Sequence, residues 1–119
     1  QVGRYTKVGR LVTAQCRLRT SAVSSQGSGY LAIAGLPFAS LAVTNIFGSG
    51  IVSYTDGVSE SDDNSPSRAY ISANDTGAVL ARYDSDDPRD EGSTSVNAGA
   101  LSTGSSKNDI IITFIYASA

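Results

Sequence analysis

The last eleven residues restrict the fold of this chain more than any other segment. Residues 109–119 read Asp-Ile-Ile-Ile-Thr-Phe-Ile-Tyr-Ala-Ser-Ala. Alternate side chains of a β-strand point to opposite faces of its sheet. One face then carries Ile110, Ile112, Phe114 and Tyr116, and the other carries Ile111 and Ile115. Burying an isoleucine is worth about 1.5 to 3 kcal/mol, so we expect both faces of this strand to be covered.

Two arrangements would cover the second face. The strand could lie in the middle of a sandwich with loops of the same chain packed outside it, or the face could contact a partner subunit. A sandwich of 119 residues has little spare chain for a third layer. We therefore predict that Ile111 and Ile115, or the opposite face of the same strand, form a subunit interface.

The rest of the chain also has the composition of strands. It contains 12 Gly and no Met or Trp, and its length fits one domain covering residues 1–119. Residues 10–20 alternate, with Val12, Ala14, Cys16 and Leu18 on one face. A short strand over residues 4–8 precedes them, and Gly9-Arg10 predicts a tight turn that joins the two strands as a hairpin.

Further short strands follow, separated by turn residues. We expect strands over 41–47 and 50–54 with a break at Gly48-Ser-Gly50, a hairpin of 68–73 with 78–83, and a weak strand near 95–101. The segment 29–38 is broken by Gly35 and Pro37. Seven or eight such strands predict an all-β fold, an antiparallel β-sandwich or a barrel.

The residue types exclude most catalytic chemistry. Histidine is absent, and Cys16 is the only cysteine, which removes His-activated nucleophiles, zinc sites of His or Cys, and an internal disulfide. We expect Cys16 to be a small buried side chain rather than a reactive thiol. A carboxylate pair could cleave a glycosidic bond, but nearly all the acids lie in predicted loops. We expect no enzyme activity and no catalytic residues.

Charge is distributed unevenly along the chain. The first 20 residues hold five basic groups and no acid, and residues 56–91 hold ten of the eleven acids. The net charge of −2 and the lack of a recognition motif argue against nucleic-acid binding. The lack of a long apolar run argues against membrane insertion. The acidic stretches 56–64 and 84–91 offer alternating carboxylates, yet neither fits an EF-hand. We predict no cofactor, with calcium as the one candidate ion.

Two motifs in the first 40 residues carry a family resemblance. The hairpin Gly3-Arg-Tyr-Thr-Lys-Val-Gly9 and the segment Gly29-Tyr-Leu-Ala-Ile-Ala-Gly-Leu-Pro-Phe38 resemble, in that order, C-terminal domains of bacteriophage tail fibres and tailspikes. The resemblance implies a jelly-roll-like sandwich that trimerises at the tip of a fibre or spike of the virion. It also implies that the domain contacts a cell-surface glycan or helps the trimer assemble. It implies no catalytic residue.

The leading hypothesis is therefore a homotrimeric domain, the C-terminal part of a longer chain, that binds a bacterial cell-surface polysaccharide. Ligand-binding residues usually lie on loops held by a rigid scaffold. We therefore expect the loops around 55–67 and 84–95 to contact the ligand. The candidate ligand-binding residues are Tyr54, Asp56, Asp62, Asp63, Arg82, Asp86 and Arg89. One alternative is a monomeric carbohydrate-binding module, with or without calcium, attached to an enzyme. Another is a glycan-cleaving domain whose carboxylates meet at a subunit interface.

Overall fold

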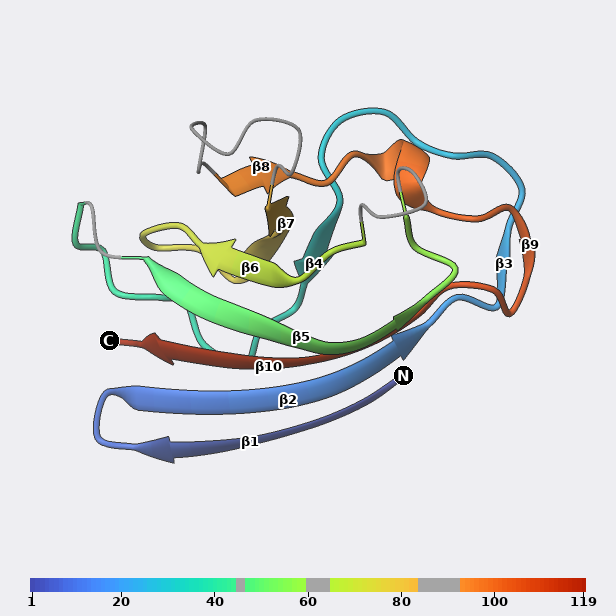
Figure 1. The fold of residues 1–119 in the computed structure, drawn as a ribbon. Coiled ribbons are helices and arrows are strands. Elements are labelled where there is room, and N and C mark those ends of the chain that lie inside the picture. Colours follow the sequence, from blue (N-terminus) through green and yellow to red (C-terminus); the bar gives the residue numbers. More distant parts are fainter. Residues whose placement is uncertain (45–46, 60–64, 84–92) are drawn as a thin grey trace.

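A computed structural model describes residues 1–44, 47–59, 65–83 and 93–119. These residues form one curled antiparallel sheet and a separate pair of short strands, with no α-helix among them (Figure 1). The all-β prediction is confirmed. The strands are β1 (Val2–Val8), β2 (Leu11–Arg19), β3 (Ala22–Val23), β4 (Ala32–Ala34), β5 (Gly48–Asp56), β6 (Arg68–Ile71), β7 (Gly77–Tyr83), β8 (Ser93–Ser95), β9 (Gly104–Ser105) and β10 (Asp109–Ala117).

The large sheet runs in the order β1-β2-β10-β5-β6-β7-β4, and β8 also pairs with β7. It folds over itself, so that β1, β2, β10 and β5 form one layer and β6, β7, β4 and β8 form the other (Figure 1). The core lies between the layers. Its largest fully buried side chains include Phe114, Ile112, Ile71 and Leu80. This arrangement is consistent with the predicted sandwich.

Both hairpins predicted from turn residues are present. β1 pairs with β2 through a turn in which Gly9 has a φ of 58°, a conformation that glycine adopts without steric cost. β6 pairs with β7 around Asn74, whose φ is 55°. Asparagine is among the few residues with a side chain that tolerate this region.

The predicted break at residues 48–50 is wrong. Gly48 and Gly50 lie inside β5, and both are buried on its inner face. Gly50 is paired with Phe114 across the β5–β10 ladder. A Cβ atom at Gly50 would lie 2.8 Å from Cδ1 of Phe114, and one at Gly48 would lie 2.5 Å from the Cβ of Tyr116. Gly50 therefore makes room for the ring of Phe114, and Gly48 makes room for the Cβ of Tyr116 and the side chain of Ile71, within a continuous strand.

Two other segments differ from expectation. Residues 41–44 and 47 form no strand, so the strand predicted over 41–47 is wrong for its described part. The predicted break in the segment 29–38 is confirmed, because β4 ends at Ala34 and Gly35 takes a φ of 87° directly after it. Near residues 95–101 the chain forms β8 and then a short 3-10 helix, Ala98–Ala100.

The close approach of Gly50 to Phe114 predicts that Gly50→Ala destabilises the fold. Overpacking of a buried site costs typically about 1 to 3 kcal/mol, and the added methyl would meet a ring that is fully buried. Gly99→Ala is the matched control, because a Cβ there meets no atom within 4 Å. Urea unfolding should show a lower midpoint for Gly50→Ala alone. Equal midpoints for the two variants would contradict this packing.

Candidate binding surfaces

β10 is a central strand with one covered face. It lies between β2 and β5, and its inner side chains Ile110, Ile112, Phe114 and Tyr116 are all buried. On the other face Ile111 is half-buried, and Ile115 keeps 46 % of its surface exposed. The alternative in which loops of the same chain cover this face is therefore wrong at Ile115.

Large apolar side chains are exposed across the same face of all four strands of this layer. Their exposed fractions range from 46 % for Ile115 to 72 % for Val8. We call the set the outer apolar face, and its members are Val2, Val8, Leu11, Ile51, Tyr54 and Ile115. The register places Ile51 opposite Thr113 and Tyr54 opposite Ile111. Polar side chains such as Arg4, Gln15 and Thr113 lie between these residues on the same face. Exposed apolar side chains gathered on one face indicate a candidate interaction site.

One ion pair lies within this face. Nε of Arg17 donates to Oδ1 of Asp109 at 3.0 Å, and its Nη2 donates to Oδ2 at 2.5 Å. The side chain of Asp109 is 8 % exposed and that of Arg17 is 55 % exposed. The hydrogen bonds from Arg17 hold the pKa of Asp109 below its ordinary value, and the positive charge of Arg19 lowers it further. The same bonds raise the pKa of the Arg17 guanidinium.

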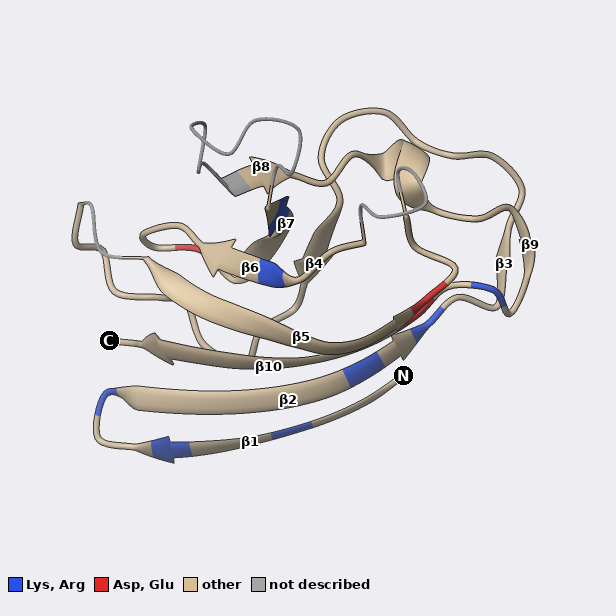
Figure 2. Cartoon of the chain, viewed as in Figure 1, with Lys and Arg blue, Asp and Glu red and all other residues tan. Residues whose placement is uncertain are grey.

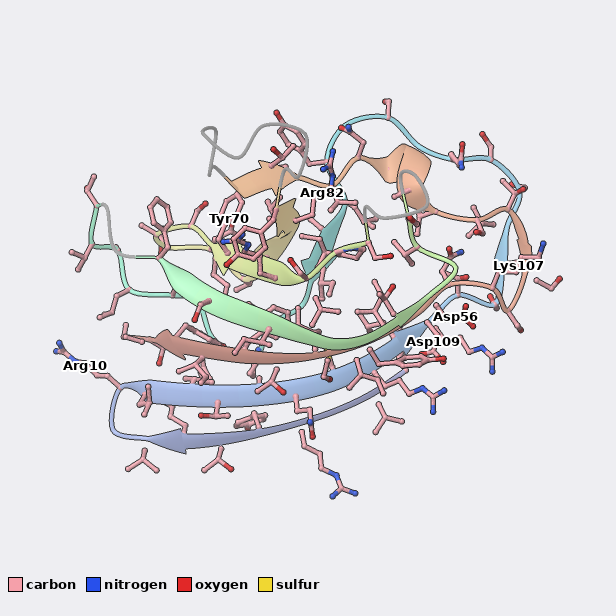
Figure 3. The ribbon with its side chains drawn as sticks, viewed as in Figure 1. Arg10, Asp56, Tyr70, Arg82, Lys107 and Asp109 are labelled. Atoms are coloured by element: carbon pink, nitrogen blue, oxygen red, sulfur yellow. The ribbon has the colours of Figure 1, made fainter. Side chains whose placement is uncertain are left out.

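The predicted ligand-binding residues are divided between two regions. Tyr54 belongs to the outer apolar face, and Asp56 is paired with Asp109 at the end of β5. Arg82 lies on β7 opposite Thr94, well apart from Asp56 (Figure 3). The structure thus places Tyr54 and Asp56 beside the predicted interface residue Ile111 and does not bring them together with Arg82.

Asp62, Asp63, Asp86 and Arg89 lie outside the described residues. No group of three or more His, Cys, Asp or Glu side chains that could hold a metal gathers within the described ranges. Calcium binding by the two acidic stretches therefore stays a prediction.

An aromatic and arginine cluster lies on the outer side of β6, β7 and β8, and sequence reasoning missed most of it. The guanidinium carbon of Arg68 lies 3.2 Å from the centroid of the Tyr83 ring. The hydroxyl of Tyr70 is 3.3 Å from Oγ of Ser95, and the Tyr70 ring meets Phe47 edge to face. The alternation of Arg68 and Tyr70 on one strand was the available signal, but the contact with Tyr83 depends on the register between strands.

A groove follows the open seam between β2 and β4. Two adjoining cavities of about 330 and 530 Å³ share Leu18 and Ile33 in their walls. Cys16 lines the first cavity and is half-buried. Burial raises the pKa of its thiol, so Cys16 is held in the protonated, less nucleophilic form. This agrees with the expectation of a packed thiol, although Cys16 is less buried than a core residue.

Charge follows the uneven distribution seen in the sequence. Figure 2 shows Lys and Arg residues along β1 and β2, and acidic residues where β5 ends and β10 begins and in the turn between β6 and β7. No helix among the described residues has both the length and the apolar character to cross a membrane.

Comparison with known proteins finds no family model, no curated protein and no solved structure that this chain matches.

The lowered pKa of Asp109 predicts how stability depends on pH. A carboxyl group whose folded-state pKa is depressed stabilises the fold above its unfolded-state pKa, which is about 3.9. That contribution is lost as pH falls through the folded-state value. We therefore expect Asp109→Asn to be less stable than the parent chain above about pH 5, with the difference shrinking below about pH 4.

Chemical denaturation across this pH range measures the effect. Asp56→Asn is the matched control, because Asp56 is an exposed carboxylate on the paired position of β5. A stability difference for Asp109→Asn that does not change with pH would contradict the ion-pair assignment.

Proposed function

We propose that this chain is the distal domain of a homotrimeric bacteriophage tail fibre or tailspike, which holds three chains together and attaches the virion to a host cell-surface polysaccharide. The observation that supports trimerisation is the outer apolar face. The attachment role rests on the resemblance of the first 40 residues and on the aromatic side chains at the surface. The domain acts by binding and assembly, without a reaction.

The outer apolar face would supply part of a subunit interface. Four strands about 4.8 Å apart, each of seven to nine residues, make a footprint on the order of 500 Å². A standard interface buries about 800 Å² of accessible surface per partner, and a side-chain surface is rougher than its footprint. Covering the exposed half of Ile115 is worth about 1 kcal/mol, and five further apolar residues add to it.

The polar groups within this face allow it to be covered. Arg17 and Asp109 satisfy each other by a two-point hydrogen-bonded pair. Breaking a buried pair by removing one partner is strongly destabilising, whereas an intact and hydrogen-bonded pair tolerates burial. The threonines between the apolar residues are small and uncharged. A neighbouring subunit that lies over the Arg17–Asp109 pair therefore leaves no unpaired charge there, and Arg4, which the register places opposite Gln15 on the same face, would need an acceptor from that subunit.

A three-fold arrangement uses different parts of this face on its two sides. In a cyclic trimer each subunit contacts its neighbours through two non-identical surfaces. The layer β1-β2-β10-β5 offers such halves, with Val2, Val8 and Leu11 on the β1–β2 side and Ile51 and Tyr54 on β5. Ile115 lies between them, close to where the axis would pass.

The interface proposal predicts that Ile115→Lys breaks the assembly without unfolding the subunit. The side chain is already 46 % exposed, so a lysine can reach solvent in the monomer, but three lysines meeting at one axis would repel and remain unpaired. Light scattering after size exclusion should give three chain masses for the parent and one for the variant. Circular dichroism should show retained strand structure.

Tyr30→Lys is the matched control. Tyr30 is 68 % exposed and is bridged to Asn97 next to β4, in the other layer of the sheet, so this variant should stay trimeric. If the parent chain is monomeric at micromolar concentration, the trimer proposal is contradicted and the monomeric carbohydrate-binding module is favoured. Calcium-dependent thermal stabilisation would point the same way.

A further inference from the structure

β4 lies at one end of the sheet, and one of its edges is open. Within the described ranges it pairs with β7 alone. Alternate residues of an antiparallel strand bond to its partner, and the residues between them direct their backbone groups away from it. The backbone nitrogen of Leu80 donates to the carbonyl oxygen of Leu31 at 2.9 Å, which makes Leu31 and Ile33 the bonded positions. Ala32 and Ala34 therefore direct their N–H and C=O groups away from β7.

The surroundings of Ala34 agree with this assignment. Gly77, its register partner on β7, donates its backbone N–H to Oδ1 of Asp75 rather than to β4. Ala32 and Ala34 are both exposed, and each lines one cavity of the groove between β2 and β4. No described strand pairs with them on that side. A second extended backbone has the complementary chemistry, because it offers donors and acceptors at the same spacing.

The two cavities of the groove follow each other along this edge. The first is lined by residues from Ile33 to Pro37, and the second by residues from Leu31 to Ile33. Side chains on one face of a strand recur every second residue, about 6.6 Å apart. A strand added to β4 would therefore send alternate side chains into successive cavities, on the inner face where Ile33 is buried.

The walls of the second cavity suit aliphatic side chains. Its apolar lining includes Leu18, Leu31, Ile33, Leu80, Leu101 and Ile110, and none of its described lining residues is aromatic. Asn108 also lines it, but its amide is already bonded to Thr20 and Ser102. A sugar would leave hydroxyl groups unpaired against such walls, at a cost in free energy. This groove is therefore suited to a different ligand from the polysaccharide.

The β1–β2 hairpin beside the groove carries positive charge without a counterion. Among its five basic residues, Arg17 has an ion-pair partner, Asp109, and no described carboxylate pairs with the other four. Arg19 lines the second cavity, while no acidic residue of the described chain lines either one. The guanidinium of Arg19 donates to the neutral carbonyl oxygen of Ser106, so its charge stays uncompensated. Complementary charge favours an acidic ligand.

We propose that the groove between β2 and β4 binds an extended, acidic segment of a partner protein by strand addition to β4. Aliphatic side chains at alternate positions of the segment enter the two cavities. The residues between them bond to the backbone of Ala32 and Ala34, and an acidic side chain at the end of the segment lies near Arg19. This inference goes beyond the proposed function and does not rest on it.

The probe is the peptide fluorescein-Glu-Val-Thr-Val-Thr-Val-Glu-amide, whose valines share one face. Fluorescence anisotropy with the full chain should show saturable binding. In an antiparallel register both threonines pair with Ala32 and Ala34, so methylation of their two backbone nitrogens should weaken binding about tenfold. A peptide with threonine in place of all three valines should also bind about tenfold more weakly, because it buries hydroxyl groups in the cavities.

The charge contribution is tested separately. Replacing both glutamates of the peptide by glutamine should weaken binding by about two- to fivefold, the range of an exposed ion pair. Arg19→Gln should reduce this difference between the two peptides. Arg10→Gln is the control, because it removes a positive charge at the β1–β2 turn, outside both cavities, and should leave the difference unchanged.

The matching change in the protein is Ala34→Pro. It removes the outward N–H of β4 and keeps the bonds to β7, and proline is tolerated on edge strands. Peptide binding should weaken about tenfold, because one acceptor of the peptide is left unpaired. Ala34→Ser is the matched control, since it keeps the N–H at the same exposed position and should bind like the parent. Thermal melting shows whether both variants fold.

Three results would overturn the site. They are no binding of the peptide by the parent, equal binding of the plain and the N-methylated peptide, and equal binding of the peptide by Ala34→Pro and Ala34→Ser. The N-methylated peptide needs no protein variant, so it decides the question even if Ala34→Pro does not fold. If a second copy of the chain occupies the groove instead, a folded Ala34→Pro will have a lower assembled mass than Ala34→Ser in light scattering. That result overturns the assignment to a partner protein.

Discussion

The packing of Phe114 and Tyr116 over the glycines of β5 is the contact on which the rest of the structure depends. β10 is the last strand in the sequence, yet it lies between β2 and β5 and joins the first hairpin to the rest of the sheet. Its inner face supplies four of the buried core residues. Gly50 leaves room for the ring of Phe114, and Gly48 leaves room for the Cβ of Tyr116 and for Ile71, so that β5 can lie close against β10 while the core stays filled.

Filling the core from the inner face of β10 fixes what its outer face must do. The side chains of a strand alternate strictly, so the register that buries Phe114 sends Ile111 and Ile115 outward. β2 obeys the same rule, which places Leu11 on this surface. The register between β5 and β10 shifts between Ile111 and Ile112, and this shift brings both Ile51 and Tyr54 to the same surface. The outer apolar face is therefore not a set of isolated exposed residues. It is the second surface of the same sheet, with an apolar pattern of its own, and that pattern is the support for the proposed assembly.

Local patterns predicted the elements whose cause is local. The alternation in β2, the turn at Gly9 and the turn at Asn74 each depend on neighbouring residues, and all three were predicted correctly. The glycines of β5 were misread because their reason is a ring that arrives from residue 114. The Arg68–Tyr83 stack was missed for a similar reason, since the two residues are 15 positions apart and meet only through the pairing of β6 with β7. Long-range register is the information that a single sequence does not display.

Arg17 and Arg68 place the same side chain in two different environments. Arg17 has its carboxylate within the chain, and this neutralises a charge that would oppose a neighbouring subunit on the same face. Arg68 instead stacks on the ring of Tyr83, and its Nε and Nη2 atoms are buried without a hydrogen-bond partner. An internally paired arginine suits a surface that is to be covered, because burial then leaves neither charge of the pair alone.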